Sequence, residues 1–277
     1  MPSPVDIPNS DGPNVYKNGA AAIDLSYISY GFVKVWLLTP SSVRIKVGIH
    51  TGNDPNSNTY YYDLKTDGST EIYPLQMGSG SYSVSVYQLA SNGGYSTIAS
   101  TNADVSLSSS LAPYLVPNQF VNYSSGSQAV AIARSIVSGK SNNYERISAV
   151  LSYVASHITY DYNLASTVQS GYIPNIDADL ASGKGICFDY AAISAAMLRS
   201  LGYPTKLVIG YVENGAVYHA WNEVYIEGQG WVKVMSVTLN TNRWSRVDVT
   251  FISSSTSPDT IAKYIGNDSN YQTVLTY

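Results

Sequence analysis

The chain has 277 residues and a formal net charge of −4 at neutral pH, and charged residues make up only 12% of it. That share is about half of what globular proteins usually carry. Without basic runs, the charge argues against nucleic-acid binding as the main activity, and no apolar run approaches the ~20 residues that a membrane-spanning helix needs. The 25 tyrosines and the abundant Ser, Thr and Asn suggest an extracellular protein, so we expect it to be secreted or held at the cell surface.

Residues 1–18 are expected to be a leader segment, of which residues 1–12 are polar and Pro-rich and lack the basic start and apolar stretch that form a signal peptide. Either the protein is cytoplasmic, or this leader segment begins after a signal peptide that has been removed, and we favour the second interpretation. The one cysteine, Cys187, excludes an intramolecular disulfide and leaves the thiol free to react. Its presence alone does not identify the compartment.

Residues 19–107 alternate apolar and polar side chains with a period of two, as Val43 and Ile45 do on either side of Arg44. Turn signals recur between these runs, which predicts roughly seven or eight short strands in an antiparallel β-sandwich. This domain holds no candidate catalytic residues. It could bind a cell-wall polymer or another partner, or only position the second domain, and we favour the scaffolding role.

Residues 108–118 are predicted to be a linker, and beyond it the hydrophobic period becomes helical. Residues 119–277 therefore form a second domain. Apolar stripes over 129–137 and 147–158 predict two helices that each bury one face, with Asn143 as a candidate N-cap of the second helix. Predicted strands follow the helices, so this domain is α+β.

The only cysteine lies at the start of a predicted helix. Gly185 precedes Cys187, and good helix formers continue to Leu201, where Gly202 gives the stop signal. In the first turn, unpaired backbone N–H groups and the helix dipole favour a thiolate. A cysteine in an arbitrary protein is more often a small buried hydrophobe, but this position is chemically suited to a nucleophile. Asp189 is expected to cap the helix start.

A thiol nucleophile needs a base, and the base needs a group that fixes its tautomer. His219 lies in a predicted strand at 218–226, whose alternation places it on one face with Trp221. Asp248 lies in a second predicted strand at 247–251. Neighbouring strands could bring Asp248 beside His219. Further strands are predicted at 206–212 and 271–277.

These three segments together resemble the transglutaminase-like (papain-like) cysteine enzymes, and in particular their secreted bacterial branch. The segment 183–199 resembles the nucleophile motif of that family, 218–224 its histidine motif and 244–251 its aspartate motif. The resemblance implies an N-terminal antiparallel β-sandwich followed by a papain/transglutaminase-like core, which is an α+β fold. It also implies that Cys187 is the nucleophile, His219 the general base and Asp248 the orienting acid.

The sequence departs from the family pattern near the aspartate. Val249 stands where the family usually has proline, and an inserted hairpin at 231–244 displaces the motif. Upstream aromatic residues can complete the oxyanion hole in the family, which makes Tyr160 and Tyr162 candidates, although packing is the favoured role for either one. Trp221 could shield the site or fill the core.

The resemblance implies a thiol acyltransferase or hydrolase that acts on protein or peptide carboxamides by glutamine transamidation or deamidation. Two alternatives stay open. One is a cysteine peptidase or amidase that acts on cell-wall peptides, and the other is a non-catalytic surface-binding module that keeps the fold. The chemistry requires no metal and no cofactor, and the sequence contains no EF-hand-like calcium loop.

Overall fold

The computed structural model describes residues 7, 11–52, 59–213, 215–227, 231–234, 237–240, 244–254 and 257–277. The chain divides into two compact units, one over Ile7–Gln119 and one that includes Phe120–Tyr277. Residues 108–118, predicted to be a linker, lie within the first unit. Among the described residues no helix is long and apolar enough to cross a membrane.

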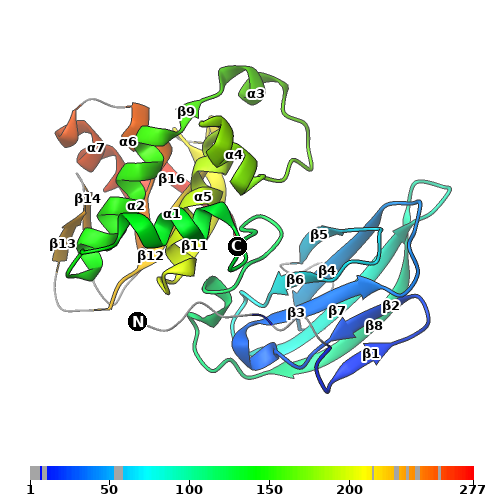
Figure 1. Ribbon diagram of the computed structural model, residues 1–277. Helices are drawn as coiled ribbons and strands as arrows, with labels where there is room; N and C mark the ends of the chain where they lie inside the picture. The colour runs from blue at the N-terminus through cyan, green and yellow to red at the C-terminus, as the bar shows by residue number, and fades with distance from the viewer. Residues whose placement is uncertain are drawn as a thin grey trace. The chain divides into compact units, whose positions relative to one another are not determined.

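The first unit consists of two four-stranded antiparallel sheets (Figure 1). One sheet has the order β1-β2-β3-β6 and the other β5-β4-β7-β8. The predicted antiparallel β-sandwich is confirmed. The strands are β1 (Val15–Lys17), β2 (Ala21–Asp24), β3 (Phe32–Leu37), β4 (Ile45–Thr51), β5 (Tyr60–Leu64), β6 (Glu71–Pro74), β7 (Gly80–Leu89) and β8 (Tyr95–Val105).

Alternating apolar side chains form the core of the first unit, where Val33, Val35, Val47 and Val86 are fully buried. Burying each of these side chains contributes about 1.5–3 kcal/mol. The short 3₁₀ helices η1 (Ile28–Tyr30) and η2 (Ala112–Tyr114) complete the unit. No cluster of His, Cys, Asp and Glu that could hold a metal ion occurs in the part of the chain that the structure describes.

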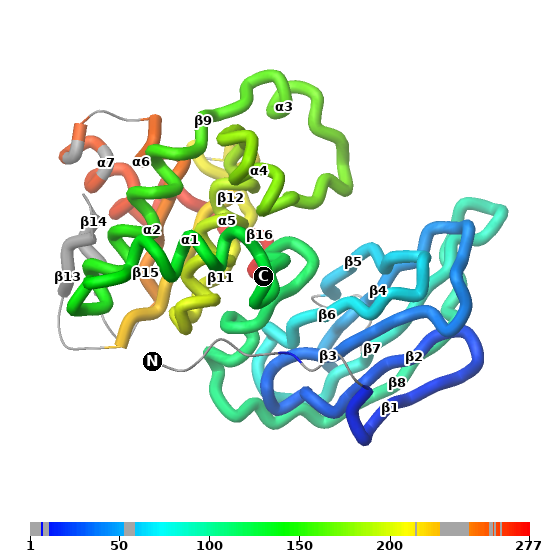
Figure 2. Tube along the Cα trace, in the orientation of Figure 1, coloured from blue at the N-terminus to red at the C-terminus, as the bar shows by residue number. Residues whose placement is uncertain are grey.

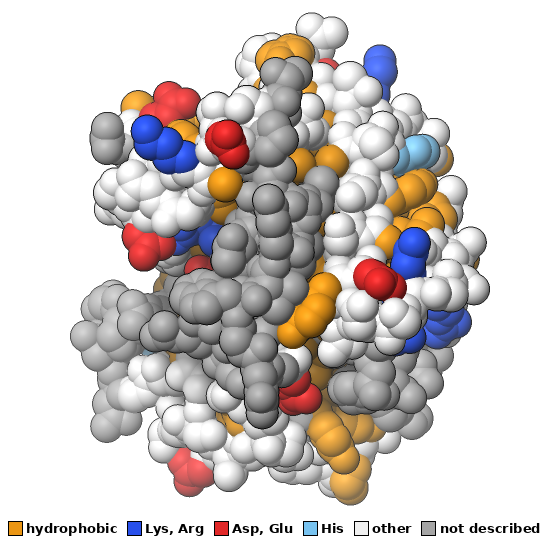
Figure 3. Space-filling model, turned by 90° about the vertical axis from the view of Figure 1, so that its left-hand side faces the viewer, with side chains coloured by type: hydrophobic (Ala, Val, Ile, Leu, Met, Phe, Trp, Pro, Cys, Tyr) orange, Lys and Arg blue, Asp and Glu red, His pale blue; other side chains and the backbone are white. Residues whose placement is uncertain are grey.

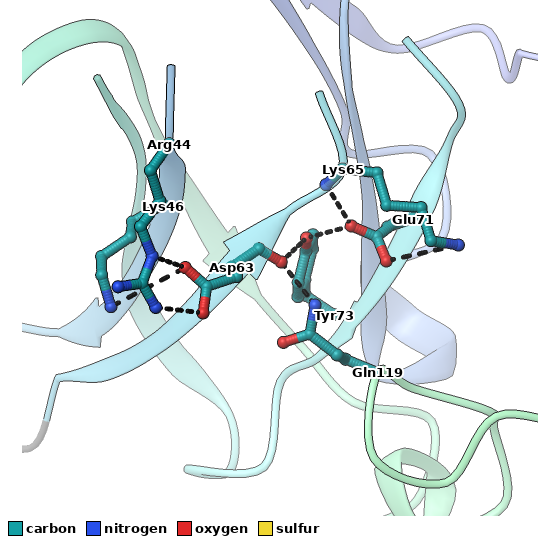
Figure 4. Close-up of polar contacts among 7 residues, drawn as sticks. All are labelled: Arg44, Lys46, Asp63, Lys65, Glu71, Tyr73 and Gln119. Carbon is teal, nitrogen blue, oxygen red and sulfur yellow. Dashed lines mark hydrogen bonds and ion pairs between the residues drawn. The ribbon is translucent and has the colours of Figure 1, made fainter. Parts of the chain in front are cut away.

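A polar network connects side chains of β5 and β6 (Figure 4). Arg44 donates to both carboxylate oxygens of Asp63, from Nε at 2.6 Å and from Nη2 at 2.7 Å. Tyr73 donates through its hydroxyl to Glu71 Oε2 at 3.1 Å. Gln119 Nε2 donates to the backbone carbonyl of Asp63, which ties the end of this unit's chain to β5.

The second unit places helices against a four-stranded antiparallel sheet of order β15-β12-β11-β16. The last strand, β16, pairs with β11, although the two strands are far apart in the sequence (Figure 2). The predicted α+β class is confirmed. The sheet strands are β11 (Thr205–Val212), β12 (Val217–Tyr225), β15 (Trp244–Val247) and β16 (Tyr271–Thr276). The helices are α1 (Gln128–Ile136), α2 (Asn143–His157), α3 (Tyr162–Thr167), α4 (Ile176–Ser182), α5 (Cys187–Ser200), α6 (Val249–Ser254) and α7 (Pro258–Ile265), with the 3₁₀ helix η3 (Asp268–Asn270) before β16.

Helix α5 is the centre of the second unit, and every residue from Asp189 to Ser200 is buried. A small-residue face of this helix, which includes Ala192 and Ala195, is fully buried, and α1, α2 and α4 pack against this helix. Small side chains allow neighbouring helices to approach α5 closely. The helix ends at the predicted stop, where Gly202 adopts a φ of 85°.

Two short strand pairs frame the sheet and the start of α5. The predicted inserted hairpin is present as β13 (Trp231–Val234) paired with β14 (Val237–Asn240). A parallel pair joins β9 (Thr159–Tyr160) to β10 (Lys184–Gly185). This second pair fixes the chain immediately before α5.

Two local predictions were wrong. The N-cap of α2 is Asn142, whose side chain accepts from the backbone N–H of Glu145 at 2.9 Å, and the predicted cap Asn143 is the first helical residue. Asp248 does not lie on a strand, because β15 ends at Val247 and α6 begins at Val249.

The charged side chains on the face shown in Figure 3 are scattered and of both signs among the described residues. Apolar and uncharged side chains lie between them. This pattern matches the low charged share of 12%.

Candidate active site

His219 and Asp248 meet because β12 and β15 are neighbours in the sheet. The register pairs Asn222 with Val247, so Asp248 follows directly at the end of β15. His219 Nε2 lies 2.8 Å from Asp248 Oδ2, and the two side chains are 13% and 1% exposed. The structure therefore brings together the predicted base and the predicted orienting acid in a nearly dry environment.

Asp248 reaches His219 from a helix start instead of a strand. Its Oδ1 accepts a hydrogen bond from the backbone N–H of Phe251 at 3.0 Å, and its carbonyl accepts from Ile252 at 3.0 Å. These are the contacts of an N-cap residue. One carboxylate oxygen thus caps the N-terminus of α6, and the other points to the histidine.

Cys187 is the first residue of α5 and is a free, half-buried thiol. Its thiol lies close enough to His219 to raise the pKa of the imidazole. Because Nε2 of the ring bonds to Asp248, Nδ1 is the ring atom left for the thiol. The structure therefore brings Cys187, His219 and Asp248 into one row, with the imidazole in the middle.

The environment of His219 favours the protonated ring. Burial lowers its pKa, but the charge and hydrogen bond of Asp248, together with the neighbouring thiol of Cys187, outweigh burial and raise the pKa to about 10. An opposite charge at hydrogen-bond distance stabilises the charged form of an imidazole. His219 is therefore an imidazolium at neutral pH, which is the state that pairs with a thiolate.

Asn222 ties the histidine strand to the cysteine helix. Its Nδ2 donates to the carbonyl of Ala191 in α5 at 3.0 Å and to that of Lys206 in β11 at 3.1 Å. The side chain is buried, so these bonds replace water. Asn222 thereby fixes β12, and His219 with it, relative to the start of α5.

The start of α5 is held by Asp189, as predicted. Asp189 Oδ2 accepts from the backbone N–H of Ile186 at 2.7 Å, and Oδ1 accepts from the hydroxyl of Tyr172 at 2.8 Å. A Cβ atom at Gly185 would lie 2.7 Å from Asp189 Cβ. The backbone at residue 185 is therefore too close to Asp189 for any residue other than glycine. Burial raises the pKa of Asp189, partly offset by these two hydrogen bonds.

Of the tentative oxyanion residues, Tyr160 lies near the thiol and Tyr162 lies further out. Tyr160 is half-buried on β9, where it pairs with Gly185, and burial, followed by the charge of Cys187, raises its pKa. Tyr162 is 77% exposed and packs edge-on against Tyr160, with ring centroids 5.0 Å apart. Their part in oxyanion stabilisation stays a prediction.

Tyr218 is a second tyrosine near the thiol, and sequence reasoning passed over it. It is exposed, and burial of part of the ring, then Tyr211, then the charge of Cys187 raise its pKa. The rings of Tyr211 and Tyr218 meet edge-on at 5.4 Å. Its place directly before His219 in the histidine motif was the signal that could have identified it.

Trp221 packs behind the imidazole. Its ring is 1% exposed and stacks on His219 with centroids 6.3 Å apart. Tyr271 meets it edge-on at 5.0 Å. This position favours packing of the imidazole over contact with a substrate, and any oxyanion role of Trp221 stays a prediction.

Tyr271 also contacts the carboxylate, and sequence reasoning did not find it. Its hydroxyl donates to Asp248 Oδ2 at 2.9 Å. The predicted strand at 271–277 begins at this residue, and the sequence gives no other signal for it. The carboxylate of Asp248 therefore accepts three hydrogen bonds, from His219, Tyr271 and the backbone of Phe251.

Comparison with known families agrees with this arrangement. Residues 130–235 match the family model described as the transglutaminase-like superfamily. These residues belong to that superfamily, and the resemblance inferred from the sequence is confirmed for this part of the chain. The matched segment contains Cys187 and His219 and ends before Asp248.

Individual relatives are distant. The "Uncharacterized protein YebA" of Bacillus subtilis (strain 168) is 29% identical over 114 residues, which is 33% of this chain and 15% of that protein. A structure described as a "Putative Cysteine Protease" from Cytophaga hutchinsonii has a TM-score of 0.44 and 12% identity, covering 95% of this chain and 83% of its own. Red sea bream transglutaminase has a TM-score of 0.33 and 12% identity, covering 79% and 48%.

Proposed function

We propose that the second unit is a thiol acyltransferase or hydrolase that acts on carboxamides of proteins or peptides, by glutamine transamidation or deamidation. One observation carries the proposal: His219 bonds to the buried carboxylate of Asp248 at 2.8 Å, and the thiol of Cys187 at the start of α5 is close enough to raise the pKa of the same imidazole. A nucleophile, a base and an orienting acid in this order are the parts of a cysteine acyl-transfer site.

In the first half-reaction the Cys187 thiolate attacks the carboxamide carbon. A C–S bond forms, and the carbonyl electron pair moves to oxygen. The His219 imidazolium then gives its proton to the departing nitrogen, the C–N bond breaks, and ammonia leaves a thioester on the enzyme. The raised pKa of His219, about 10, keeps this proton available at neutral pH.

In the second half-reaction neutral His219 takes a proton from the incoming amine or water. A lysine amine gives a crosslink, and water gives the deamidated product. The C–S bond breaks and the thiolate re-forms beside the imidazolium. Asp248 remains a carboxylate throughout and holds the imidazole in the required tautomer.

The developing oxyanion needs donors near the start of α5. Backbone N–H groups of the first helical turn are directed there, and the hydroxyl of Tyr160 is the side-chain candidate because β9 is paired with the segment directly before Cys187. Tyr160→Phe should therefore lower kcat by about 10²-fold, whereas Tyr162→Phe should have little effect because that ring is exposed.

The products separate the possible reactions. The full chain is incubated with dimethylated casein and the fluorescent amine dansylcadaverine, and Cys187→Ala serves as the inactive control. Amine incorporation supports transamidation, and ammonia release without incorporation supports deamidation. New N-termini in the casein instead indicate a cysteine peptidase with the same first step. Failure to form any of these products, by a folded chain with a reactive thiol, on casein, glutamine peptides and cell-wall peptides contradicts the proposal and favours a binding module.

A further inference from the structure

Tyr271 and His219 share one oxygen atom of Asp248. The tyrosine hydroxyl donates to Oδ2 at 2.9 Å, and His219 Nε2 lies 2.8 Å from the same atom. Tyr271 reaches it because β16 pairs with β11 and places Tyr271 opposite Val212. A chain segment far from the cysteine and histidine motifs therefore contacts the same carboxylate oxygen as the histidine.

The ring of Tyr271 is enclosed by other side chains. It is buried in a small apolar cluster with Val208, Val212 and Trp221. Trp221 meets it edge-on at 5.0 Å and Tyr264 at 5.8 Å, and the guanidinium of Arg246 lies 4.3 Å from its centroid. Because these contacts hold the ring from several sides, the hydroxyl has a fixed direction.

The hydroxyl remains a donor at every working pH. Burial, and then the charge and hydrogen bond of Asp248, raise the pKa of Tyr271. A buried carboxylate is costly unless donors replace its lost water. Tyr271 supplies one of the three donors that Asp248 has among the described residues.

We propose that Tyr271 is a positioning residue of this site, and that its hydroxyl holds the Asp248 carboxylate in register with His219 and draws part of the negative charge away from Oδ2. Its effect on turnover rests on the proposed function, whereas its effect on the histidine does not. Without the hydroxyl, Oδ2 would attract the imidazole proton more strongly and the carboxylate would be held less firmly.

The groups that face the His219–Asp248 pair come from every described element packed around it. They are the thiol of Cys187 on α5, Arg246 on β15, Tyr264 on α7 and Tyr271 on β16, with Glu213 in the turn after β11 acting on Tyr264. Only Tyr271 among them donates to the histidine's own acceptor atom. Its removal should therefore change the imidazole directly.

The test is Tyr271→Phe in the full chain, which removes one oxygen and keeps the ring. Tyr203→Phe is the matched control, because Tyr203 is also buried but its hydroxyl bonds to Asn143 Oδ1 at 3.0 Å, away from the site. Histidine labelled with ¹³C and ¹⁵N is followed by NMR, and His219→Gln assigns the signal among the three histidines.

In Tyr271→Phe we expect the His219 Nε2 proton to move downfield and the titration midpoint of the ring to rise by about 0.5 to 1 pH unit. In the Asp248→Asn background the same change should have no effect, because the shared acceptor is gone. Tyr203→Phe should match the wild type. An unchanged imidazole, a midpoint that falls, or an equal shift in the Asp248→Asn background would overturn the proposal.

A measurement on the wild type covers the case in which Tyr271→Phe fails to fold. The hydroxyl proton of Tyr271 should exchange slowly and show a nuclear Overhauser contact with the Nε2 proton of His219, because both lie on Oδ2. Absence of that contact in a slowly exchanging site would contradict the shared acceptor. If the site is catalytic, Tyr271→Phe should also lower amine incorporation about tenfold; an inactive wild type with the expected imidazole shifts would refute only the proposed function.

Discussion

Asp63 in the first unit and Asp248 in the second each bind a cationic partner, but their surroundings differ. Arg44 Nε lies 2.6 Å from Asp63 Oδ1, with the two side chains 50% and 31% exposed (Figure 4). His219 Nε2 lies 2.8 Å from Asp248 Oδ2, with 13% and 1% exposed. Water screens the first pair to about 0–1 kcal/mol. Burial and additional donors, more than contact distance, therefore distinguish a candidate catalytic pair from a surface ion pair.

Replacing each aspartate by asparagine should give the largest difference in activity between the two pairs. Asp248→Asn should lower kcat/KM for amine incorporation by about 10³- to 10⁴-fold, because the amide favours the wrong tautomer of His219. Asparagine is also a good N-cap, so α6 should still form, but loss of the charge that stabilises the imidazolium should lower the melting temperature. Asp63→Asn should leave kcat/KM within about twofold, because its pair belongs to the first unit, in which no candidate catalytic residue lies. Wild-type activity in Asp248→Asn would remove Asp248 from the site.

The pH dependence of stability should also separate the two pairs. Because the folded pKa of His219, about 10, lies above its unfolded value of about 6.5, its stabilisation is complete below about pH 6.5. It is lost as pH rises through the folded pKa. The difference in unfolding free energy between the wild type and His219→Gln should therefore fall by about 4 kcal/mol between about pH 6 and pH 10.

Arg44→Gln gives the control for this pH series. The guanidinium keeps its charge throughout the range, so the difference between the wild type and Arg44→Gln in urea unfolding should stay constant. A His219 difference that is equally flat would contradict the assignment of an imidazolium bonded to Asp248.

Glycine at the start of α5 offers a test of the packing that holds the thiol. In Gly185→Ala the new Cβ would lie 2.7 Å from Asp189 Cβ, so the unfolding free energy should fall by about 1–3 kcal/mol. At Gly126 the nearest atom to such a Cβ is 3.9 Å away, and Gly126→Ala should be close to neutral. Chemical denaturation of both variants provides the measurement, and equal stability would mean that the close approach is not needed.

The smallest effect is expected on the surface pair itself. Arg44→Ala should lower the unfolding free energy by less than about 1 kcal/mol, and salt should reduce the difference further. Thermal unfolding at low and high salt measures it. A loss as large as that of Gly185→Ala would show that exposure is a poor guide to the strength of this pair.

Local patterns in the sequence were sufficient for much of the fold and for the main site residues. The period of two in the first unit, the apolar stripes of α1 and α2, and the helix formers and stop signal of α5 depend on neighbours in the chain. The positions of Cys187 and His219 follow from these elements. The sequence could also suggest Asp248, because the segment 244–251 resembles the aspartate motif despite the inserted hairpin and Val249.

Tertiary contacts determined what the sequence could not reveal. Asn142 and Asn143 are equally good caps, and only the backbone decides between them. Asn222 resembles any polar strand residue until α5 packs beside it. Tyr271 is one of 25 tyrosines, and only the pairing of β16 with β11 singles it out.

The most direct test of the central claim is the pH dependence of Cys187 alkylation by iodoacetamide, in the wild type and in His219→Ala. An ordinary thiol with a pKa of about 8.5 reacts slowly at about pH 6. If His219 and Asp248 form a working pair with the thiol, the wild type should label rapidly at that pH and the variant should not. Slow labelling that rises only near pH 8.5 in both proteins would contradict the account.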